Sequence, residues 1–182
     1  MQRLFISVNC DNKVKAQFLA VQEKIKTQSV KGSFTRPENL HLTLVFLGET
    51  PEDKIPLISS LIDRALKPPI APFSLVFSTV GCFKHSKKEL WWIGTDDNDT
   101  RLDTLKTIRQ RIAENLLSKD VNFDNRPFNP HITLGREVKH TSPIIIQKQE
   151  IIFPVNRISL MKSERMSGIL TYTEIFGMNL AG

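Results

Sequence analysis

The strongest constraint on this chain is an internal repeat of nine residues. Residues 36–44 read RPENLHLTL and residues 126–134 read RPFNPHITL, so six of nine positions agree. Average composition gives about one chance identity or fewer in nine. The two histidines lie 90 positions apart (131 − 41), close to half of the 182 residues. We therefore predict that one supersecondary unit is duplicated, and that residues 1–182 form a single domain of two pseudo-symmetric lobes.

The hydrophobic pattern before each copy predicts a similar series of elements, in which strands, a helix and a loop precede the motif strand. Residues 4–8 alternate as a half-buried strand, and apolar residues at helical spacing follow over 14–25, with Gln22 on the polar face. Thr50 is the expected N-cap of the next helix, although Pro56 favours a start a few residues later. Asp99 or Thr100 is the expected cap of the helix with its apolar stripe over 102–116. The remaining predicted strands cover 40–47, 73–80, 89–94, 144–153, 155–161 and 170–178.

Strand geometry predicts how the two motifs face one another. In an extended segment, side chains at i and i+2 share a face about 6.5 to 7 Å apart. His41 and Thr43 therefore point to one side, and so do His131 and Thr133. The leucines at 40, 42 and 44, Phe46, and the apolar residues at 132 and 134 are expected on the opposite face, against the helices. The two polar pairs are left for a groove between the lobes.

Two imidazoles and two hydroxyls in one groove suit in-line displacement at phosphorus. Such a reaction needs a base to activate the attacking oxygen and an acid to protonate the leaving oxygen, and histidine serves both roles near neutral pH. Thr43 and Thr133 can donate hydrogen bonds to non-bridging phosphate oxygens. Arg136, five residues after His131, is predicted on the same face, where its guanidinium matches phosphate geometry.

Composition limits the partners. The 25 Lys and Arg against 19 Asp and Glu give a net charge of +6, which mildly favours a polyanion such as nucleic acid. Cys10 and Cys82 form no C-x-x-C spacing, so a zinc site or disulfide is not predicted and a reducing cytoplasm fits best. No carboxylate cluster or metal-ligand spacing is evident, and no cofactor is expected. Neither a signal peptide nor a membrane-spanning run is recognisable.

Several further residues permit two interpretations. Arg36 and Arg126 are either cations of the groove or solvated loop residues. His85 and His140, which lack the motif, are expected at the surface. Trp91 and Trp92 alternate across a strand, so one is expected in the core while the other could stack on a base.

The paired motifs resemble those of the 2H phosphoesterases, and within them those of the bacterial and archaeal RNA 2′,3′-cyclic phosphodiesterases, also called 2′-5′ RNA ligases. The similarity extends over nearly the whole chain. It rests on RLFI at 3–6, NLHLTLVFLG at 39–48, LWWIG at 90–94 and the second repeat at 126–134. The resemblance implies a bilobal α+β fold with antiparallel sheets flanking a central groove and helices outside. Trp92 departs from the aliphatic residue often found there.

The resemblance also implies an activity, the metal-independent hydrolysis of a terminal 2′,3′-cyclic phosphate on RNA to a 2′-phosphate. By analogy His41 is the general acid and His131 the general base, while Thr43, Thr133 and Arg136 hold the phosphate. The histidines could exchange roles in a reverse ligation, and a monomer is expected. Two alternatives stay open at this point: a phosphodiesterase for small cyclic phosphates, and a non-catalytic module that binds RNA ends.

Overall fold

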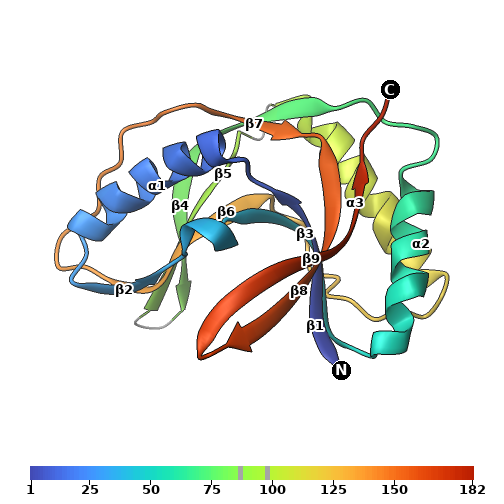
Figure 1. The fold of residues 1–182 in the computed structure, drawn as a ribbon. Helices are drawn as coiled ribbons and strands as arrows, with labels where there is room; N and C mark the ends of the chain where they lie inside the picture. Colours follow the sequence, from blue (N-terminus) through green and yellow to red (C-terminus); the bar gives the residue numbers. More distant parts are fainter. Residues whose placement is uncertain (86–87, 97–98) are drawn as a thin grey trace.

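The computed structural model describes residues 1–85, 88–96 and 99–182, without the side chain of His85, so the expectation for that histidine lies outside the described residues. Three helices and nine strands, with two short 3-10 turns, make up the described ranges (Figure 1). In chain order these are β1 (Gln2–Asn9), α1 (Asn12–Thr27), β2 (Lys31–Phe34), η1 (Pro37–Asn39), β3 (His41–Thr50), η2 (Glu52–Lys54), α2 (Ile55–Ala65), β4 (Phe73–His85), β5 (Lys88–Thr95), α3 (Leu102–Leu117), β6 (His131–Lys139), β7 (Ile151–Val155), β8 (Arg157–Met166) and β9 (Ile169–Asn179).

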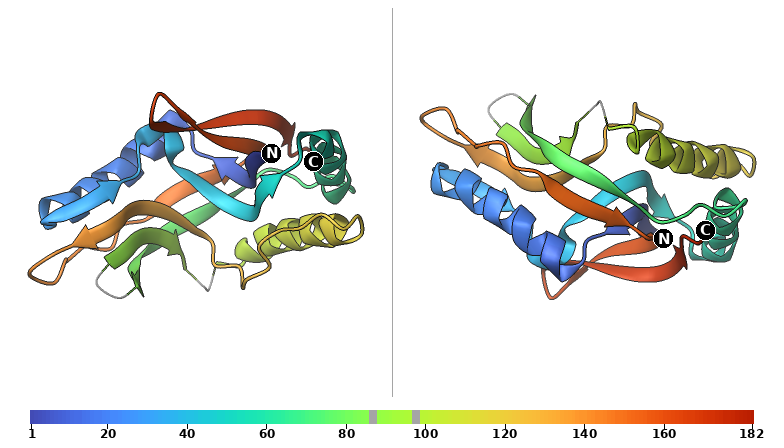
Figure 2. Two further views of the ribbon diagram at one scale, coloured as in Figure 1. Left: turned by 90° about the horizontal axis from the view of Figure 1, so that it is seen from below. Right: turned by 90° about the horizontal axis from the view of Figure 1, so that it is seen from above.

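The strands form two sheets in which neighbouring strands are antiparallel. The first has the order β3-β1-β8-β9, and the second has the order β2-β6-β5-β4-β7. Helix α1 lies at one end of the molecule against the second sheet, and α2 and α3 pack together at the other end (Figure 2). The predicted α+β fold with antiparallel sheets is thereby confirmed. No helix in the described ranges is long and apolar enough to cross a membrane.

The two sheets repeat one strand order. Four strands of the second sheet, β6-β5-β4-β7, match β3-β1-β8-β9 of the first, and β2 is an additional edge strand. The helices are exchanged, because α1 follows β1 but contacts β2, β6 and β7, whereas α3 follows β5 but contacts β3. Helix α1 therefore covers the sheet that contains the second motif strand, and α3 contacts the sheet that contains the first. The division into two pseudo-symmetric lobes stays a prediction, which the matching strand orders support.

An aromatic cluster explains why α1 covers the second sheet. The fully buried Phe18 of α1 has its ring centroid 5.6 Å from that of Phe77 in β4 and 6.2 Å from that of Phe153 in β7. Phe77 and Phe153 also contact each other at 5.2 Å. Truncating such a buried ring to alanine costs about 3 to 5 kcal/mol. Phe18→Ala is therefore the single change expected to loosen α1 most.

Two burial predictions near the N-terminus were wrong. Phe5 and Ser7 are buried along with the apolar residues of β1, because β1 is an inner strand between β3 and β8 and its second face is also covered. Gln22 is buried rather than exposed on α1, since its amide Nε2 donates to the backbone oxygens of Thr35 and Leu134, both at 2.8 Å. Gln22 thereby ties α1 to the segment that leads into the first motif and to the second motif strand.

Several predicted boundaries also differ. β3 continues through Gly48, whose φ of 71° suits glycine, to Thr50, so Thr50 ends a strand and does not cap a helix. α2 starts only at Ile55, with Pro56 in its first turn, which confirms the later start that this proline favoured.

The helix expected over 102–116 is α3, but Asp99 and Thr100 do not cap it, since Arg101 occupies the N-cap position and makes no side-chain capping bond. Of the strand predicted over 144–153, only residues from Ile151 onward are extended in a sheet.

Candidate active site

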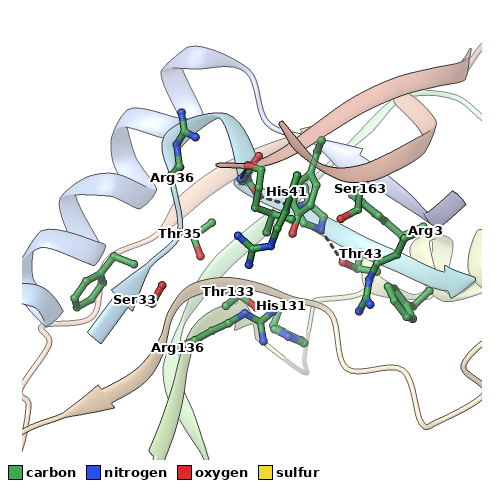
Figure 3. Close-up of a pocket in the computed structure, with 17 residues that line it drawn as sticks. Arg3, Ser33, Thr35, Arg36, His41, Thr43, His131, Thr133, Arg136 and Ser163 are labelled. Carbon is green, nitrogen blue, oxygen red and sulfur yellow. Dashed lines mark hydrogen bonds between the residues drawn. The ribbon is translucent and has the colours of Figure 1, made fainter. Parts of the chain in front are cut away.

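The five predicted site residues line one pocket between the two sheets. His41 and Thr43 reach it from β3, and His131, Thr133 and Arg136 reach it from β6 (Figure 3). The pocket has a volume of about 360 Å³. The structure thus brings together the two motifs that lie half a chain apart. Other lining residues, which were not predicted as part of the site, include Arg3, Phe5, Asn39, Ser163, Arg165 and Tyr172.

A bulge in β3 changes which side chains face the pocket. Thr43 and Val45 pair with successive residues of β1, so Leu44 is an extra residue without a partner. After this bulge the alternation of faces is reversed. Phe46, which was predicted for the core, therefore lines the pocket.

A bulge at the equivalent place in β6 positions Arg136. Thr133 and Gly135 pair with successive residues of β5, so Leu134 is the extra residue. Arg136 lies five positions after His131, and in an unbroken strand that odd offset would place it on the opposite face. The predicted placement of Arg136 in the groove is correct, but the bulge is its cause, and simple alternation would have excluded it.

Backbone carbonyls fix both imidazoles in the same orientation. Nδ1 of His41 lies 2.7 Å from the backbone oxygen of Asn39, and Nδ1 of His131 lies 2.7 Å from that of Asn129. A carbonyl only accepts, so Nδ1 carries hydrogen in both rings and Nε2 is the nitrogen that gains or loses a proton. Nε2 of His41 also lies 2.9 Å from Oγ1 of Thr43.

His41 is held among aromatic rings. Its ring centroid is 4.7 Å from that of Phe5 and 5.2 Å from that of Tyr172, which meets it edge-on. Burial lowers the pKa of His41 to about 4, against the opposing effect of its hydrogen bond to the Asn39 carbonyl, and the charges of Arg136 and His131 lower it further. His41 is therefore neutral at pH 7 in the free protein.

His131 has a similar pair of aromatic neighbours on the second sheet. Phe83 contacts it edge-on at 5.5 Å, and Trp92 lies at 6.2 Å. Burial lowers the pKa of His131 below its usual 6.5, and Arg136 adds to this effect, while the hydrogen bond to the Asn129 carbonyl opposes it. In the free protein, both histidines thus favour the neutral form more than an exposed histidine does.

The two adjacent tryptophans have different surroundings in the structure. Trp91 is buried and its Nε1 donates to Glu89 at 2.9 Å, so it is the core residue of the pair. Trp92 does not line the pocket. Its ring packs behind His131 in space left by Gly81, where an added Cβ would lie 2.6 Å from the indole. Trp92 therefore packs against a motif histidine, and its stacking on a substrate base stays a prediction.

The pocket is positively charged. Of the described residues that line it, four are arginines and none is Asp or Glu. Arg36 is one of them and forms an ion pair with Glu38. Arg126, its counterpart in the second repeat, is outside the pocket, with 85% of its side chain exposed and Asp124 as its partner. Of the two repeat arginines, only Arg36 is thus a pocket cation.

The remaining histidine and the cysteines have other partners. His140 is not a free surface residue, since Nε2 lies 2.9 Å from the carboxylate of Glu89 and Nδ1 lies 2.9 Å from the Ser142 carbonyl. Cys10 and Cys82 are free thiols, and burial raises the pKa of Cys10 to about 12. In the described part of the chain, no three His, Cys, Asp or Glu side chains gather to hold a metal ion.

Comparison with known proteins identifies the class. The chain belongs to the 2′-5′ RNA ligase superfamily, whose family profile matches residues 14–166. A relative from Thermotoga maritima, named RNA 2′,3′-cyclic phosphodiesterase, is 28% identical over 172 residues, covering 94% of this chain and 89% of its own. A relative of the same name from Escherichia coli is 27% identical over 175 residues, covering 96% and 94%.

Solved structures share the architecture. The crystal structure of a Thermus thermophilus protein superposes with a TM-score of 0.79 at 28% identity, covering 98% of this chain and 97% of that one. E. coli LigT complexed with 3′-AMP gives a TM-score of 0.80 at 24% identity, covering 100% and 99%, which shows the shared fold. The predicted family is confirmed, and with it the predicted class of enzyme, a phosphodiesterase.

Proposed function

We propose that this protein is an RNA 2′,3′-cyclic phosphodiesterase that opens a terminal cyclic phosphate to a 2′-phosphate. The observation that carries this proposal is the pair of histidines in one arginine-lined pocket, each held at Nδ1 by a backbone carbonyl so that Nε2 is the nitrogen that titrates. Relatives that align over nearly their full length carry this name. The predicted metal independence, monomeric state and cytoplasmic location stay predictions.

In the proposed reaction each histidine moves one proton. His131 accepts a proton from water as the water oxygen attacks phosphorus, and His41 donates a proton to the 3′ oxygen as its bond to phosphorus breaks. The products are a 2′-phosphate and a 3′-hydroxyl. With the 5′-hydroxyl of a second RNA in place of water, the same steps form a 2′-5′ linkage, and the reverse reaction exchanges the roles of the histidines.

Substrate binding raises the pKa of His41, so that the ring takes up from solvent the proton that it needs as an acid. Its pKa of about 4 leaves it neutral in the free protein at pH 7. A bound phosphate adds a negative charge beside the ring, in surroundings from which water is largely excluded, and there the attraction between charges is strong. Burial disfavours the imidazolium form of His41 in the free protein. For the same reason, a bound anion should raise the pKa of His41 strongly.

The phosphate would be held by the hydroxyls and the arginine of the two motif strands. Thr43 and Thr133 can donate to non-bridging oxygens, and the guanidinium of Arg136 can bind two oxygens at once. Arg136 makes no ion pair with a carboxylate in the described part of the chain. Its charge also lowers the pKa of both histidines, so it belongs to the same electrostatic unit.

An oligonucleotide ending in a 2′,3′-cyclic phosphate, incubated with the protein in EDTA, tests this function. We expect a 2′-phosphate product, and a loss of about 10²- to 10⁴-fold in kcat for His41→Ala and for His131→Ala. Arg126→Gln, at an exposed site outside the pocket, is the matched control and should keep full activity. Absence of turnover, or turnover unaffected by the histidine variants, would refute the proposal.

The same assay separates the alternatives. Faster turnover of a small cyclic phosphate than of any RNA end would make the small molecule the substrate. Tight binding of a cyclic-phosphate RNA end without product from about pH 5 to 8, where histidine titrates, would make the protein a binding module.

A further inference from the structure

A row of polar side chains crosses the first sheet beside the two histidines. Arg3 in β1 pairs with Ser163 in β8, and Ser163 pairs with Tyr172 in β9. Residues directly opposite one another on neighbouring strands lie on the same face of a sheet, and all three residues line the pocket. The row therefore presents a guanidinium and two hydroxyl groups together.

Arg3, like Arg136, differs from the other two arginines of this pocket in having no ion pair or side-chain hydrogen bond in the described part of the chain. Arg36 forms an ion pair with Glu38, and Arg165 donates from Nη1 to the Gly168 carbonyl at 2.9 Å. In the described ranges Arg3 has neither an ion pair nor a side-chain hydrogen bond. Its guanidinium carbon lies 5.0 Å from the centroid of the Phe46 ring, a cation–π contact that holds the group in place without satisfying its N–H donors.

Arg3 and Ser163 lie on the side of the histidines opposite to Arg136, whereas Tyr172 contacts the ring of His41. Figure 3 shows Arg3 and Ser163 on the same side of His41 as Thr43, with Arg136 on the other side of His131. Within β1, Arg3 precedes Ser7, the partner of Thr43, by four residues, which corresponds to about 13 Å along a strand. Arg136 and the threonines already supply donors for the phosphate that reacts. The position of Arg3 thus suits a second anion next to the first.

We propose that Arg3 and Ser163 bind the phosphodiester on the 5′ side of the terminal nucleotide, and that they make the protein prefer oligonucleotides to small cyclic phosphates. This inference rests on the proposed function. In an RNA with a cyclic end, the phosphate nearest to the reacting one is attached to the 5′ oxygen of the same ribose. A nucleoside cyclic phosphate with a free 5′-hydroxyl lacks it, so Arg3 would have no ligand there.

Two substrates that differ by one group test the proposal. Adenosine 2′,3′-cyclic phosphate is compared with its 5′-phosphorylated form, and the dinucleotide with the same cyclic end follows as a third substrate. We expect Arg3→Gln to lower kcat/KM by about 10- to 100-fold on the two substrates that carry the 5′ phosphate, the range for a hydrogen bond to a charged group. On the 5′-hydroxyl substrate we expect a change of less than about threefold, and Arg3→Lys should recover part of the loss.

Control variants show whether the loss of activity on 5′-phosphorylated substrates is specific to Arg3. Arg126→Gln should behave like the unmodified protein on all three substrates, and thermal unfolding of each variant checks the fold. An equal loss on every substrate, no loss on any, or a loss specific to the 5′ phosphate in Arg36→Gln instead of Arg3→Gln would each overturn the proposal.

A binding measurement separates failure of this inference from failure of the proposed function. Calorimetry compares adenosine 2′-phosphate with adenosine 2′,5′-bisphosphate. We expect the second phosphate to increase affinity about tenfold or more, and Arg3→Gln to remove that gain. If no substrate is turned over, the proposed function fails, but this difference in affinity still supports or refutes the second phosphate site.

Discussion

The two motif copies have the same local geometry and different surroundings. In both, Nδ1 of the histidine meets the carbonyl two residues earlier, and a bulge follows the threonine. His41 additionally has its Nε2 against the Thr43 hydroxyl, and its pKa falls to about 4. For Nε2 of His131, no protein partner is found in the described part of the chain. The sequence repeat thus sets orientation, while neighbouring elements set the proton affinity of each ring.

The difference bears on the roles of the two histidines. From the free protein alone, the ring with the strongly lowered pKa would be taken as the base, whereas the family resemblance makes His41 the acid. A bound phosphate would raise the pKa of His41. If the leaving 3′ oxygen also takes the place of Thr43 at Nε2 of His41, this ring is the acid despite its low pKa in the free protein. Experiments that treat the two histidines differently are therefore the most informative.

The largest effect is expected with a sulfur leaving group. In a cyclic substrate whose 3′ oxygen is replaced by sulfur, the leaving thiolate needs no proton, so an acid is dispensable and a base is not. We expect His41→Ala, which loses about 10²- to 10⁴-fold on the oxygen substrate, to approach the unmodified protein on the sulfur substrate. His131→Ala should remain impaired. Recovery of His131→Ala instead would exchange the two roles.

Arg136→Gln is expected to have the next largest effect. The loss of a charged hydrogen bond to phosphate, worth about 1.5 to 3 kcal/mol, lowers kcat/KM by about 10- to 100-fold. It also removes the charge that lowers the pKa of both histidines, so both pKa values should rise. Steady-state rates over a pH series measure both effects. Arg136→Lys, which keeps the charge, should lose activity without this shift, and an identical shift in both variants would contradict the argument.

The pH dependence of kcat/KM in the unmodified protein tests the protonation states of the two histidines together. The reactive form has one neutral and one protonated histidine, and kcat/KM reports the pKa values of the free protein. Both pKa values lie below 6.5, so the protonated partner is lost as pH rises. We expect kcat/KM to fall from pH 6.5 to 8 by up to about tenfold per unit, while kcat declines only at higher pH because bound phosphate favours the imidazolium. A flat or rising kcat/KM over this range would contradict the lowered pKa values.

Much of this site was predictable because its determinants are local. The alternation of polar and apolar residues placed His41 and Thr43 on one face, and the repeat located their counterparts in β6. Arg3 and Phe5 alternate with the apolar residues of β1, so a period-two signal for them was present in the sequence.

The remainder depends on long-range contacts. Tyr172 reaches His41 through the pairing of β8 with β9, and no local pattern fixes that register. The bulges that turn Phe46 and Arg136 toward the pocket arise from pairing with another strand, so they too are absent from the local alternation. The exchange of helices between sheets was likewise not predictable. The apolar stripe of α1 indicates that one face of the helix is buried, but it does not indicate which sheet covers that face.

The smallest expected effect compares the two asparagines of the repeat. Asn39 is buried, and its Nδ2 donates to the Leu170 carbonyl at 2.9 Å, whereas Asn129 is exposed. Asn39→Ala should cost about 1 kcal/mol in the free energy of unfolding, the net value of one hydrogen bond, and Asn129→Ala less than about 0.5 kcal/mol. The Oδ1 atom of Asn39 is buried without a partner in the described structure, so its removal offsets part of the loss.

Denaturant unfolding of the two variants measures this difference in the free energy of unfolding. Their activities show whether the contacts of each asparagine side chain also affect catalysis. Both substitutions keep the backbone carbonyl that binds Nδ1 of the histidine, so neither should change kcat by more than about tenfold if that carbonyl alone orients the ring. Asn39 also joins the first motif to β9, which carries Tyr172 against His41. A large fall in kcat for Asn39→Ala without one for Asn129→Ala would therefore show that His41 depends on this long-range contact, whereas equal costs of unfolding would mean that the two copies are held alike.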